Sequence, residues 1–270
     1  MKKLKIGLFV FIVVGAVWSL FIEPSLLVQN NQKFAWYGPQ LRIAFFSDLH
    51  AGAPYITKEY IKKLIVRINE QKPDIILVGG DLVMNGVIGG EIMSIEELAP
   101  LLKELTAPMG IFITLGNHDW WSNGDNIRTV LEKHEIQVLE NQAVLLNHKK
   151  SRFWLIGIGD DFTNHADPTK AFATVNSEDA KIVFMHDPAA LFKVKNNYQL
   201  AIAGHMHGGQ VFIPGIGALV TPGAAPNSWA KGWIDFPMGK LFVSRGIGTS
   251  IFPVRFNAVP EYVILELDSR

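Results

Sequence analysis

Five short polar clusters in the sequence combine residue types that bind divalent metal ions. Each cluster contains aspartate, asparagine or histidine, and the clusters are Asp48-Leu49-His50, Gly80-Asp81, Gly116-Asn117-His118-Asp119, His186-Asp187 and Gly204-His205-Met206-His207. Carboxylate oxygen, imidazole nitrogen and amide oxygen are ligands for zinc, manganese or iron. The chain has no cysteine, which excludes disulfides, thiolate metal sites and a cysteine nucleophile.

Each cluster taken alone has an ordinary alternative interpretation. An isolated Asp-x-His pair is commonly a loop, Gly-Asp a turn, Asn-His-Asp a helix-capping turn, and a single histidine a structural residue at a strand end. Here, however, every cluster directly follows an apolar run that is typical of a strand. Ligands bind at the carboxyl ends of strands in α/β sheets, so the five clusters are expected to converge on one rim. The glycines before Asp81, Asn117 and His205 are expected to allow close backbone approach or positive φ.

Apolar runs alternate with helical patterns from Leu41 onward, which indicates an α/β architecture. Helices are expected over 57–70, with Thr57 as N-cap, over 95–105, with Ser94 as a possible cap, and over 126–134. Strands are expected over 41–47, 74–80, 110–115, 138–146, 153–158, 182–185, 200–203, 210–213, 241–244 and 262–267. Because the second half is richer in strands, we expect two packed sheets with helices outside.

The ordered clusters resemble the signature of the calcineurin-like metallophosphoesterases, which reads D-x-H, G-D, G-N-H-[DE], H and G-H-x-H. This resemblance covers residues 42–207. The segments 204–210, 243–248 and 253–256 look like one branch, the membrane-associated or exported bacterial phosphodiesterases, which includes hydrolases of the lipid A precursor UDP-2,3-diacylglucosamine. The resemblance implies an α/β fold of the four-layer αββα type, with two divalent metal ions, manganese, zinc or iron.

The resemblance also implies how the two ions are held. One ion would be bound by Asp48, His50 and His207, the other by Asn117, His186 and His205, with Asp81 bridging both. Two metal ions about 3.5–4 Å apart can polarise a bridging water to hydroxide and clamp phosphoryl oxygens, so that no protein nucleophile is required. His118 would act at the leaving-group oxygen, as a general acid or by stabilising charge.

One position departs from the family pattern. Many members read G-D-x-x-D, and the second aspartate supports the catalytic histidine, whereas this chain has Met84 there. Either Asp119 orients His118 instead, or no carboxylate does. Arg245 has two interpretations, as a contact to a phosphate oxygen or as a structural arginine.

The N-terminal segment differs from the rest of the chain. Three lysines precede an uncharged apolar run over 6–22, which as a helix would span roughly 25 Å of a hydrocarbon core about 30 Å thick. We expect residues 1–22 to be an uncleaved transmembrane signal-anchor, with a cleaved signal peptide and an interfacial helix as alternatives. The lysines favour a cytoplasmic N-terminus and an extracytoplasmic domain. Residues 23–40 are expected to be a linker, or to pack early onto the catalytic domain of residues 41–270.

Apolar side chains near the clusters suggest a substrate with a lipid part, or loops that dip into a membrane. They comprise Trp120 and Trp121, the loop 84–93 with Met84, Val87, Ile88, Ile92 and Met93, and a later loop with Trp229, Trp233 and Phe236. The alternative is that they pack on one another beneath the loops.

The expected function is hydrolysis of a phosphodiester or pyrophosphate, with a phospholipid or a UDP-linked lipid as candidate substrates. UDP-linked lipid A precursors are made on the cytoplasmic face, which conflicts with an external domain. Either the substrate is an envelope phospholipid or cell-wall phosphodiester, or the helix does not orient as the lysines predict. A binding module that keeps its metal is the alternative, and a metallopeptidase would need a motif such as H-E-x-x-H, which is absent. With a formal net charge of zero, no nucleic-acid partner is expected.

Overall fold

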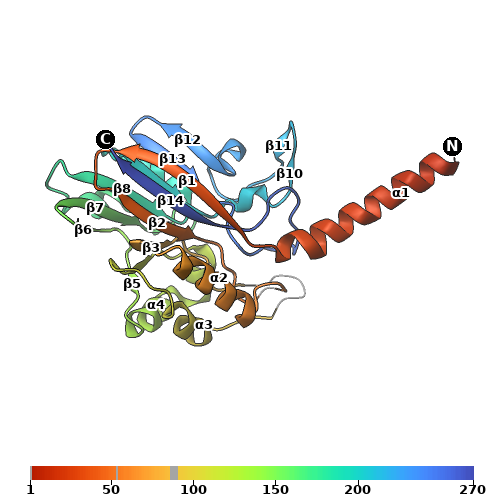
Figure 1. Ribbon diagram of the computed structural model, residues 1–270, viewed down its shortest axis with the longest axis horizontal. Coiled ribbons are helices and arrows are strands. Elements are labelled where there is room, and N and C mark those ends of the chain that lie inside the picture. Colours follow the sequence, from red (N-terminus) through yellow and green to blue (C-terminus); the bar gives the residue numbers. More distant parts are fainter. Residues whose placement is uncertain (1, 53, 86–90) are drawn as a thin grey trace.

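Two six-stranded β-sheets form the centre of the protein, which we describe from a computed structural model covering residues 2–52, 54–85 and 91–270 (Figure 1). The first sheet has the order β1-β14-β2-β3-β4-β5, with the bounds Val28–Trp36, Glu261–Ser269, Leu41–Phe46, Ile75–Val78, Ile111–Ile113 and Gln137–Val138. Strands β2 to β5 run parallel, while β14 is antiparallel to β2. Helices α2, α3 and α4 cover the outer face of this sheet; they span Lys58–Glu70, Ile95–Leu102 and Asn117–Lys133.

The second sheet is built from the other half of the chain. Its order is β12-β13-β9-β8-β7-β6, with the bounds Gly232–Phe236, Gly239–Val243, Leu200–Ala203, Ala180–Met185, Ser151–Ile158 and Gln142–His148. Helix α5 and the 3-10 turns η3 and η5 lie against its outer face; they span Pro168–Phe172, Pro188–Lys193 and Asn227–Trp229. A short hairpin, β10–β11, has the strands Phe212–Ile213 and Gly217–Ala218 and stands apart from both sheets, and the turn η4, His207–Gly209, precedes it.

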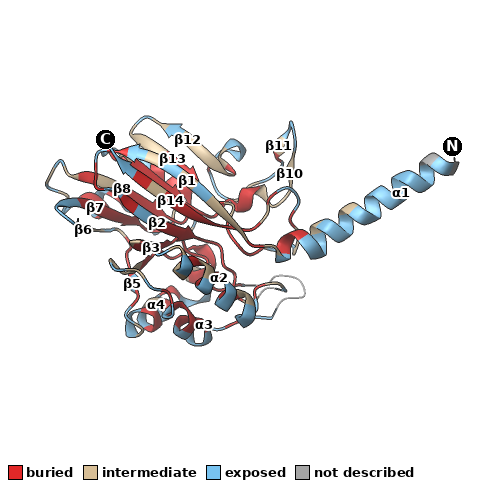
Figure 2. Ribbon diagram, viewed as in Figure 1, coloured by how far each residue is buried: buried red, intermediate tan, exposed pale blue. Residues whose placement is uncertain are grey.

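Three apolar layers hold the fold together, which confirms the predicted four-layer αββα sandwich. The central layer takes alternate side chains of both sheets, such as Phe45, Phe184 and Phe242, because successive residues of a strand face opposite sides. The first sheet packs its other face on α2, α3 and α4, and the second on α5 and η3. Buried residues accordingly concentrate along the strands and the inner helix faces (Figure 2).

Local sequence signals explain two of the helices. In α2 the Thr57 side chain accepts a hydrogen bond from the Tyr60 N–H, and one apolar face of the helix is buried. In α3 Ser94 and Glu97 form a reciprocal capping box. Both predicted N-caps are therefore confirmed.

The third helix begins earlier than the sequence predicts. We expected 126–134, but α4 starts at Asn117, directly after the metal-binding motif begins. Asp119 accepts from the Gly116 N–H at 2.9 Å, which caps the first turn. The backbone leaves helical geometry at Asn123, whose side chain accepts from the Asn126 N–H and restarts the helix there. The predicted segment corresponds to this second part.

Residues 28–36, assigned to a linker from the sequence, form the edge strand β1 instead. This strand pairs in parallel with β14 along its whole length, from Val28 with Glu261 to Trp36 with Ser269. Asn31 and Lys33 are exposed, while the Trp36 side chain is buried between the sheets. The alternative of early packing onto the domain therefore holds for this stretch.

The N-terminal helix α1, Lys2–Val17, projects away from the sheets and continues through η1, Trp18–Ile22, and η2, Glu23–Ser25 (Figure 1). Within the described residues, Lys5–Ser25 is one helix long and apolar enough to cross a membrane. Its apolar side chains are exposed, in contrast to those of the domain helices (Figure 2). A single such helix is also what a signal sequence would form.

Candidate metal centre

The five polar clusters meet where the carboxyl ends of the two sheets face each other. Asp48 and Asp81 follow β2 and β3 of the first sheet, while His186 and His205 follow β8 and β9 of the second. Asn117 opens α4 just beyond β4. The predicted convergence of strand ends therefore brings residues far apart in sequence to one point.

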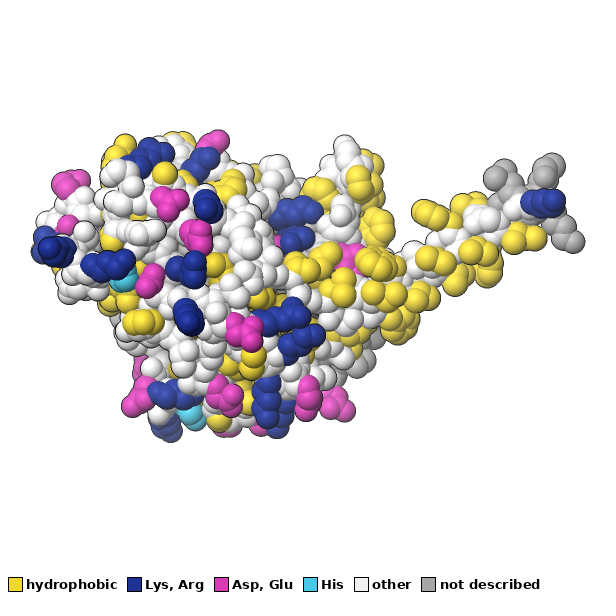
Figure 3. All heavy atoms as spheres, in the orientation of Figure 1, with side chains coloured by type: hydrophobic (Ala, Val, Ile, Leu, Met, Phe, Trp, Pro, Cys, Tyr) yellow, Lys and Arg dark blue, Asp and Glu magenta, His cyan; other side chains and the backbone are white. Residues whose placement is uncertain are grey.

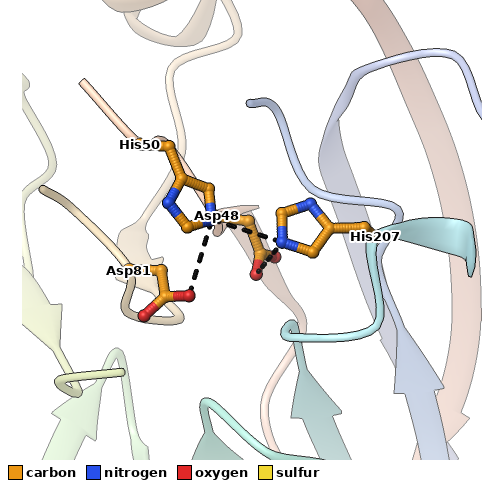
Figure 4. Close-up of side chains that lie close together, drawn as sticks. All are labelled: Asp48, His50, Asp81 and His207. Atoms are coloured by element: carbon orange, nitrogen blue, oxygen red, sulfur yellow. Dashed lines mark hydrogen bonds and ion pairs between the residues drawn. The ribbon is translucent and has the colours of Figure 1, made fainter. Parts of the chain in front are cut away.

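A first group of side chains turns its polar atoms toward a common centre (Figure 4). Asp48, His50, Asp81 and His207 each offer one oxygen or nitrogen atom, and these atoms lie within 4.8 Å of one another. The Nε2 atoms of His50 and His207 are 3.2 Å apart. His50 Nε2 lies 3.5 Å from Asp81 Oδ2, and His207 Nε2 lies 3.5 Å from Asp48 Oδ1.

A second group shares Asp81 with the first. Asp81, His186 and His205 also offer atoms within 4.8 Å of one another. His186 Nε2 is 3.3 Å from Asp81 Oδ2 and 2.9 Å from His205 Nδ1. Asn117 Oδ1 reaches the same His186 nitrogen at 3.1 Å. The two groups are therefore adjacent, with one carboxylate in common.

The donor atoms of both groups fit divalent cations. Imidazole nitrogens face one another at 2.9 and 3.2 Å, where two neutral lone pairs would repel unless a cation or proton lies between them. His186 Nδ1 lies 2.7 Å from the Gly79 carbonyl, to which it donates, and this bond directs Nε2 at the centre. All of these side chains are buried, and carboxylate with imidazole suits zinc, manganese or iron.

The protonation pattern also suits metal binding. Burial lowers the pKa of His50 to about 3 and holds the pKa values of His205 and His207 well below their usual range, so these imidazoles are neutral. Burial would raise the pKa of Asp81, but the charge of His186 and its hydrogen bond outweigh this and keep that pKa well below its ordinary value. Burial would lower the pKa of His186, but the charge of Asp81 and its hydrogen bond outweigh this and hold that pKa well above its ordinary value, so His186 carries a proton that a bound cation would replace. Neutral imidazole and ionised carboxylate are the forms that coordinate metals.

Five of the converging residues adopt a backbone conformation that is rare outside glycine. Their φ angles are positive, at 54° for Asp48, 46° for His50, 53° for Asp81, 68° for His205 and 50° for His207. Each such residue costs of order 1 kcal/mol, and this strain typically concentrates at functional sites. The fold thus accepts local strain in order to direct these side chains inward.

The glycines of the clusters serve close approach, as expected. A Cβ on Gly80 would lie 2.5 Å from the Gly116 nitrogen, and one on Gly116 would lie 2.7 Å from the Asp81 nitrogen. A Cβ on Gly204 would lie 2.7 Å from Asp48 Oδ2. Gly80 also has a φ of 79°. Larger residues would therefore displace the carboxylates of the centre.

His118 lies at the edge of the first group. Its ring packs edge-on against His50 with 4.7 Å between the centroids. The Asn85 N–H donates to His118 Nδ1 at 3.4 Å, and Ser250 Oγ lies 3.4 Å from Nε2. Burial lowers the pKa of this histidine.

A backbone amide, rather than a carboxylate, therefore orients His118. Asp119 does not do so, because its oxygens accept from the backbone N–H groups of Leu82, Val83 and Gly116. Met84, which occupies the position of the family's second aspartate, is buried in the core between the first sheet and its helices.

Arg245 is structural, which decides between its two interpretations. Its guanidinium pairs with the buried Glu261 carboxylate, with Nε at 2.7 Å from Oε2. The same carboxylate accepts from the Arg245 backbone N–H.

An aromatic wall borders the second group. Trp121 contacts His118 with 4.9 Å between centroids, and Phe162 lies between Trp121 and His205, at 5.9 and 5.3 Å. Phe162 and Ser250 were not predicted as site residues. For Phe162 a signal was present, because Gly159-Asp160-Asp161 follows the expected strand 153–158 and marks another strand end at the rim.

The other aromatic and apolar loops divide between the two predicted roles, internal packing and exposure near the site. Trp229 and Phe236 pack with Phe192, and Trp233 stacks on Phe34, so this loop follows the packing alternative. Trp120 stacks on His165 and packs against the core between the first sheet and its helices. In the loop 84–93, Met84 and Met93 are buried and Ile92 is exposed, while Val87 and Ile88 lie outside the described residues.

The fold and the paired Asp/His groups define a metallophosphoesterase, and comparison with known proteins agrees. Residues 41–209 match the calcineurin-like phosphoesterase family, and the chain belongs to that family. Similar proteins include a phosphodiesterase and a pyrophosphatase, and this chain is a hydrolase of phosphoester bonds.

Three similar proteins indicate the branch of the family to which this chain is similar. The uncharacterized metallophosphoesterase YkuE of Bacillus subtilis is 29% identical over 84% of this chain and 79% of its own length. Phosphodiesterase YaeI of Escherichia coli is 29% identical over 94% of this chain and 93% of its own length. UDP-2,3-diacylglucosamine pyrophosphatase LpxG of Chlamydia muridarum is 25% identical over 92% of both chains. This chain is thus similar to the predicted branch over nearly its whole length.

Proposed function

We propose that the protein is a dinuclear metal-dependent phosphodiesterase or pyrophosphatase. The observation that carries the proposal is the pair of buried groups that share Asp81, because a shared carboxylate between two cation-sized clusters is the arrangement of a two-metal hydrolase. The family membership and the names of the relatives support the same reaction class.

In this proposal each group holds one ion. Asp48, His50 and His207 would hold the first ion, and Asn117, His186 and His205 would hold the second, while Asp81, which belongs to both groups, would contribute to each. When bound, two such ions supply an activated water as nucleophile and neutralise charge on the phosphoryl oxygens. The chain itself fixes the ligand directions through the strand ends, the Gly79 carbonyl and the Ser47 hydroxyl.

His118 acts on the leaving group. Because Nδ1 accepts from the Asn85 N–H, the ring proton of the neutral imidazole is assigned to Nε2. That N–H can donate to the leaving-group oxygen and stabilise its charge as the ester bond breaks. Ser250 Oγ lies 3.4 Å from Nε2, so this nitrogen faces a hydroxyl oxygen with which it can share a proton.

The substrate that we favour is a lipid-linked phosphodiester or pyrophosphate. An apolar helix continuous with the domain and an aromatic wall beside the centre both suit a substrate with acyl chains. LpxG, by its name, cleaves a lipid-linked sugar pyrophosphate. The N-terminal lysines favour an external domain anchored by a single span, for which an envelope phospholipid is a better candidate than a UDP-linked lipid.

The test is hydrolysis of a chromogenic phosphodiester and its monoester by the full chain in detergent. Metal-stripped protein should be inactive, added manganese should restore turnover, and Asp81→Asn should abolish it. Diester turnover that survives both metal removal and Asp81→Asn would refute the two-metal proposal. Two tightly bound ions without turnover of either ester, or of phospholipid and UDP-linked lipid, would identify a binding module.

A further inference from the structure

An exposed apolar surface surrounds the point where the N-terminal helix joins the domain. It consists of the β10–β11 hairpin with the residues that follow it and the loop 249–252, and its exposed side chains are Ile216, Leu219, Val220, Ile251 and Phe252. We call this set the juxtamembrane surface. Figure 3 shows hydrophobic side chains running from the helix onto the adjoining part of the domain, whereas the opposite end carries mixed charges.

Hydrogen bonds make this surface one unit with the helix junction. The Arg255 N–H donates to the Ser19 carbonyl at 3.0 Å, and the buried Glu23 carboxylate accepts from the Ala258 N–H at 2.6 Å. The Phe212 N–H donates to the Phe256 carbonyl at 2.9 Å, which joins the hairpin to the same loop. A helix that crosses a bilayer would therefore hold the hairpin and the loop at the membrane boundary.

The segments that form this surface lack the charged residues that are usual on a water-exposed surface. Residues 208–230 and 246–254 contain no Asp, Glu, Lys or Arg. The hairpin turn over 213–216 places Ile216 at its tip with the residue 71% exposed, where turns normally carry polar residues. A contiguous exposed apolar patch of this kind marks a protein or membrane contact.

Ile251 adds an independent observation. It has a φ of 62°, a conformation that β-branched residues rarely adopt, yet it is 61% exposed. Packing within the domain does not explain an isoleucine there, and glycine or asparagine would relieve the backbone. An apolar environment outside the protein does explain it.

We infer that the juxtamembrane surface inserts into the interfacial layer of the same bilayer that α1 crosses. An amphipathic element of this kind binds by burying apolar side chains at the headgroup–acyl boundary. The occupant is lipid rather than a second protein, because the surface is continuous with the membrane-spanning helix and carries no charged side chain for a specific partner. This inference does not depend on the proposed hydrolysis.

The insertion would bring the metal centre to the headgroup layer. Gly248 donates its N–H to the Asp48 carbonyl at 2.6 Å, and Ser250 Oγ reaches His118. Ile251 is the next residue, and consecutive Cα atoms are about 3.8 Å apart. A phosphodiester in a lipid headgroup could then approach His118 without leaving the membrane.

The test uses the absence of native cysteine. Ile216→Cys, Leu219→Cys and Ile251→Cys are each labelled with a small fluorophore in the full chain reconstituted in phospholipid vesicles. Val13→Cys in α1 reports the bilayer, and Tyr37→Cys is the matched control. Tyr37 is 72% exposed and lies beside the C-terminal residue Arg270, whose guanidinium is 5.5 Å from its ring. The C-terminus lies at the opposite end of the protein from α1 (Figure 1). Quenching by lipid-attached nitroxide and by aqueous iodide is measured for each label.

We expect nitroxide to quench positions 216, 219 and 251 nearly as strongly as position 13. Iodide quenching at these positions should be at least about 3-fold weaker than at position 37. Labels that respond like Tyr37→Cys would overturn the inference. Shielding from iodide without nitroxide quenching, together with disulfide-linked dimers of Ile216→Cys, would assign the surface to a second copy and also overturn it. Neither readout requires turnover, so soluble-diester hydrolysis separately tests the proposed function.

Discussion

Removal of the Ser47 hydroxyl should weaken one metal site selectively. Ser47 is fully buried, and its Oγ donates to Asp48 Oδ2 at 2.5 Å. A hydrogen bond to a charged group contributes about 1.5–3 kcal/mol, and loss of a group that orients a metal ligand costs roughly 10- to 100-fold in affinity. Asp48 also accepts from the His205 N–H at 2.9 Å, and Ser47→Ala leaves this second donor in place. We therefore expect the lower part of that range, about 10- to 30-fold.

The assay is competition between the protein and a fluorescent chelator for manganese at pH 7.5. One of the two binding steps should weaken, because Asp48 belongs to only one of the two groups. Ser177→Ala is the control, since Ser177 also donates to a carboxylate, Asp179 Oδ2 at 2.6 Å, but far from the centre. Equal affinity of Ser47→Ala and the unchanged protein for both ions would refute the assignment of Asp48 as a ligand.

Four further outcomes are expected. His118→Gln should lower kcat by about 10²- to 10⁴-fold with both metal ions retained, as metal analysis would show; loss of metal instead would make His118 a ligand. Nitrogen NMR of His118 should find the proton on Nε2, whereas a proton on Nδ1 would contradict the bond from Asn85. Burial raises the pKa of Glu140 to about 7 against the attraction of Arg128, so its contribution to stability is present below its unfolded pKa of about 4.3 and is lost as pH rises through 7. In urea unfolding, the free energy of unfolding of the unchanged protein should fall by about 2–4 kcal/mol through Glu140 between pH 4 and 8, and Glu140→Gln should abolish this fall. The same pH dependence in both proteins would contradict the prediction. Arg255→Lys should cost about 3–5 kcal/mol in thermal unfolding, because a buried guanidinium bonds several carbonyls; a cost below about 1 kcal/mol would contradict this.

The metal-binding clusters were predictable because their signal is local. A polar residue directly after a buried apolar run marks a strand end, and parallel strands bring their carboxyl ends together. Asp48, Asp81 and His186 all follow this rule, and the glycines beside them show the close approach that their type suggests. The caps Thr57 and Ser94 were likewise readable from a few adjacent residues.

Features that depend on distant contacts were not predictable. The strand β1 has the sequence pattern of a polar linker, since Gln29-Asn30-Asn31-Gln32 is an uninterrupted polar run, and only its pairing with β14, over 200 residues away, makes it a strand. The contact of Ser250 with His118 joins residues 132 positions apart. The pattern of apolar and polar residues within a segment does not show which distant segment it contacts. The support of His118 was also hidden, because a backbone amide leaves no mark in the sequence.

The segment after the last ligand explains a motif whose meaning the sequence alone did not give. Within 245–261, Gly246 and Gly248 fit closely against Asp48 and His50, and a Cβ on Gly246 would lie 2.6 Å from Asp48 Oδ2. Arg255 then binds the carbonyls of Gly248 and Arg245, while its own N–H reaches Ser19 of the helix junction. One buried arginine therefore connects the backbone beneath the metal centre to the N-terminal helix. If that connection holds the centre at the bilayer, its two glycines and its arginine act together, and changing any one should disturb both metal binding and the depth of Ile251.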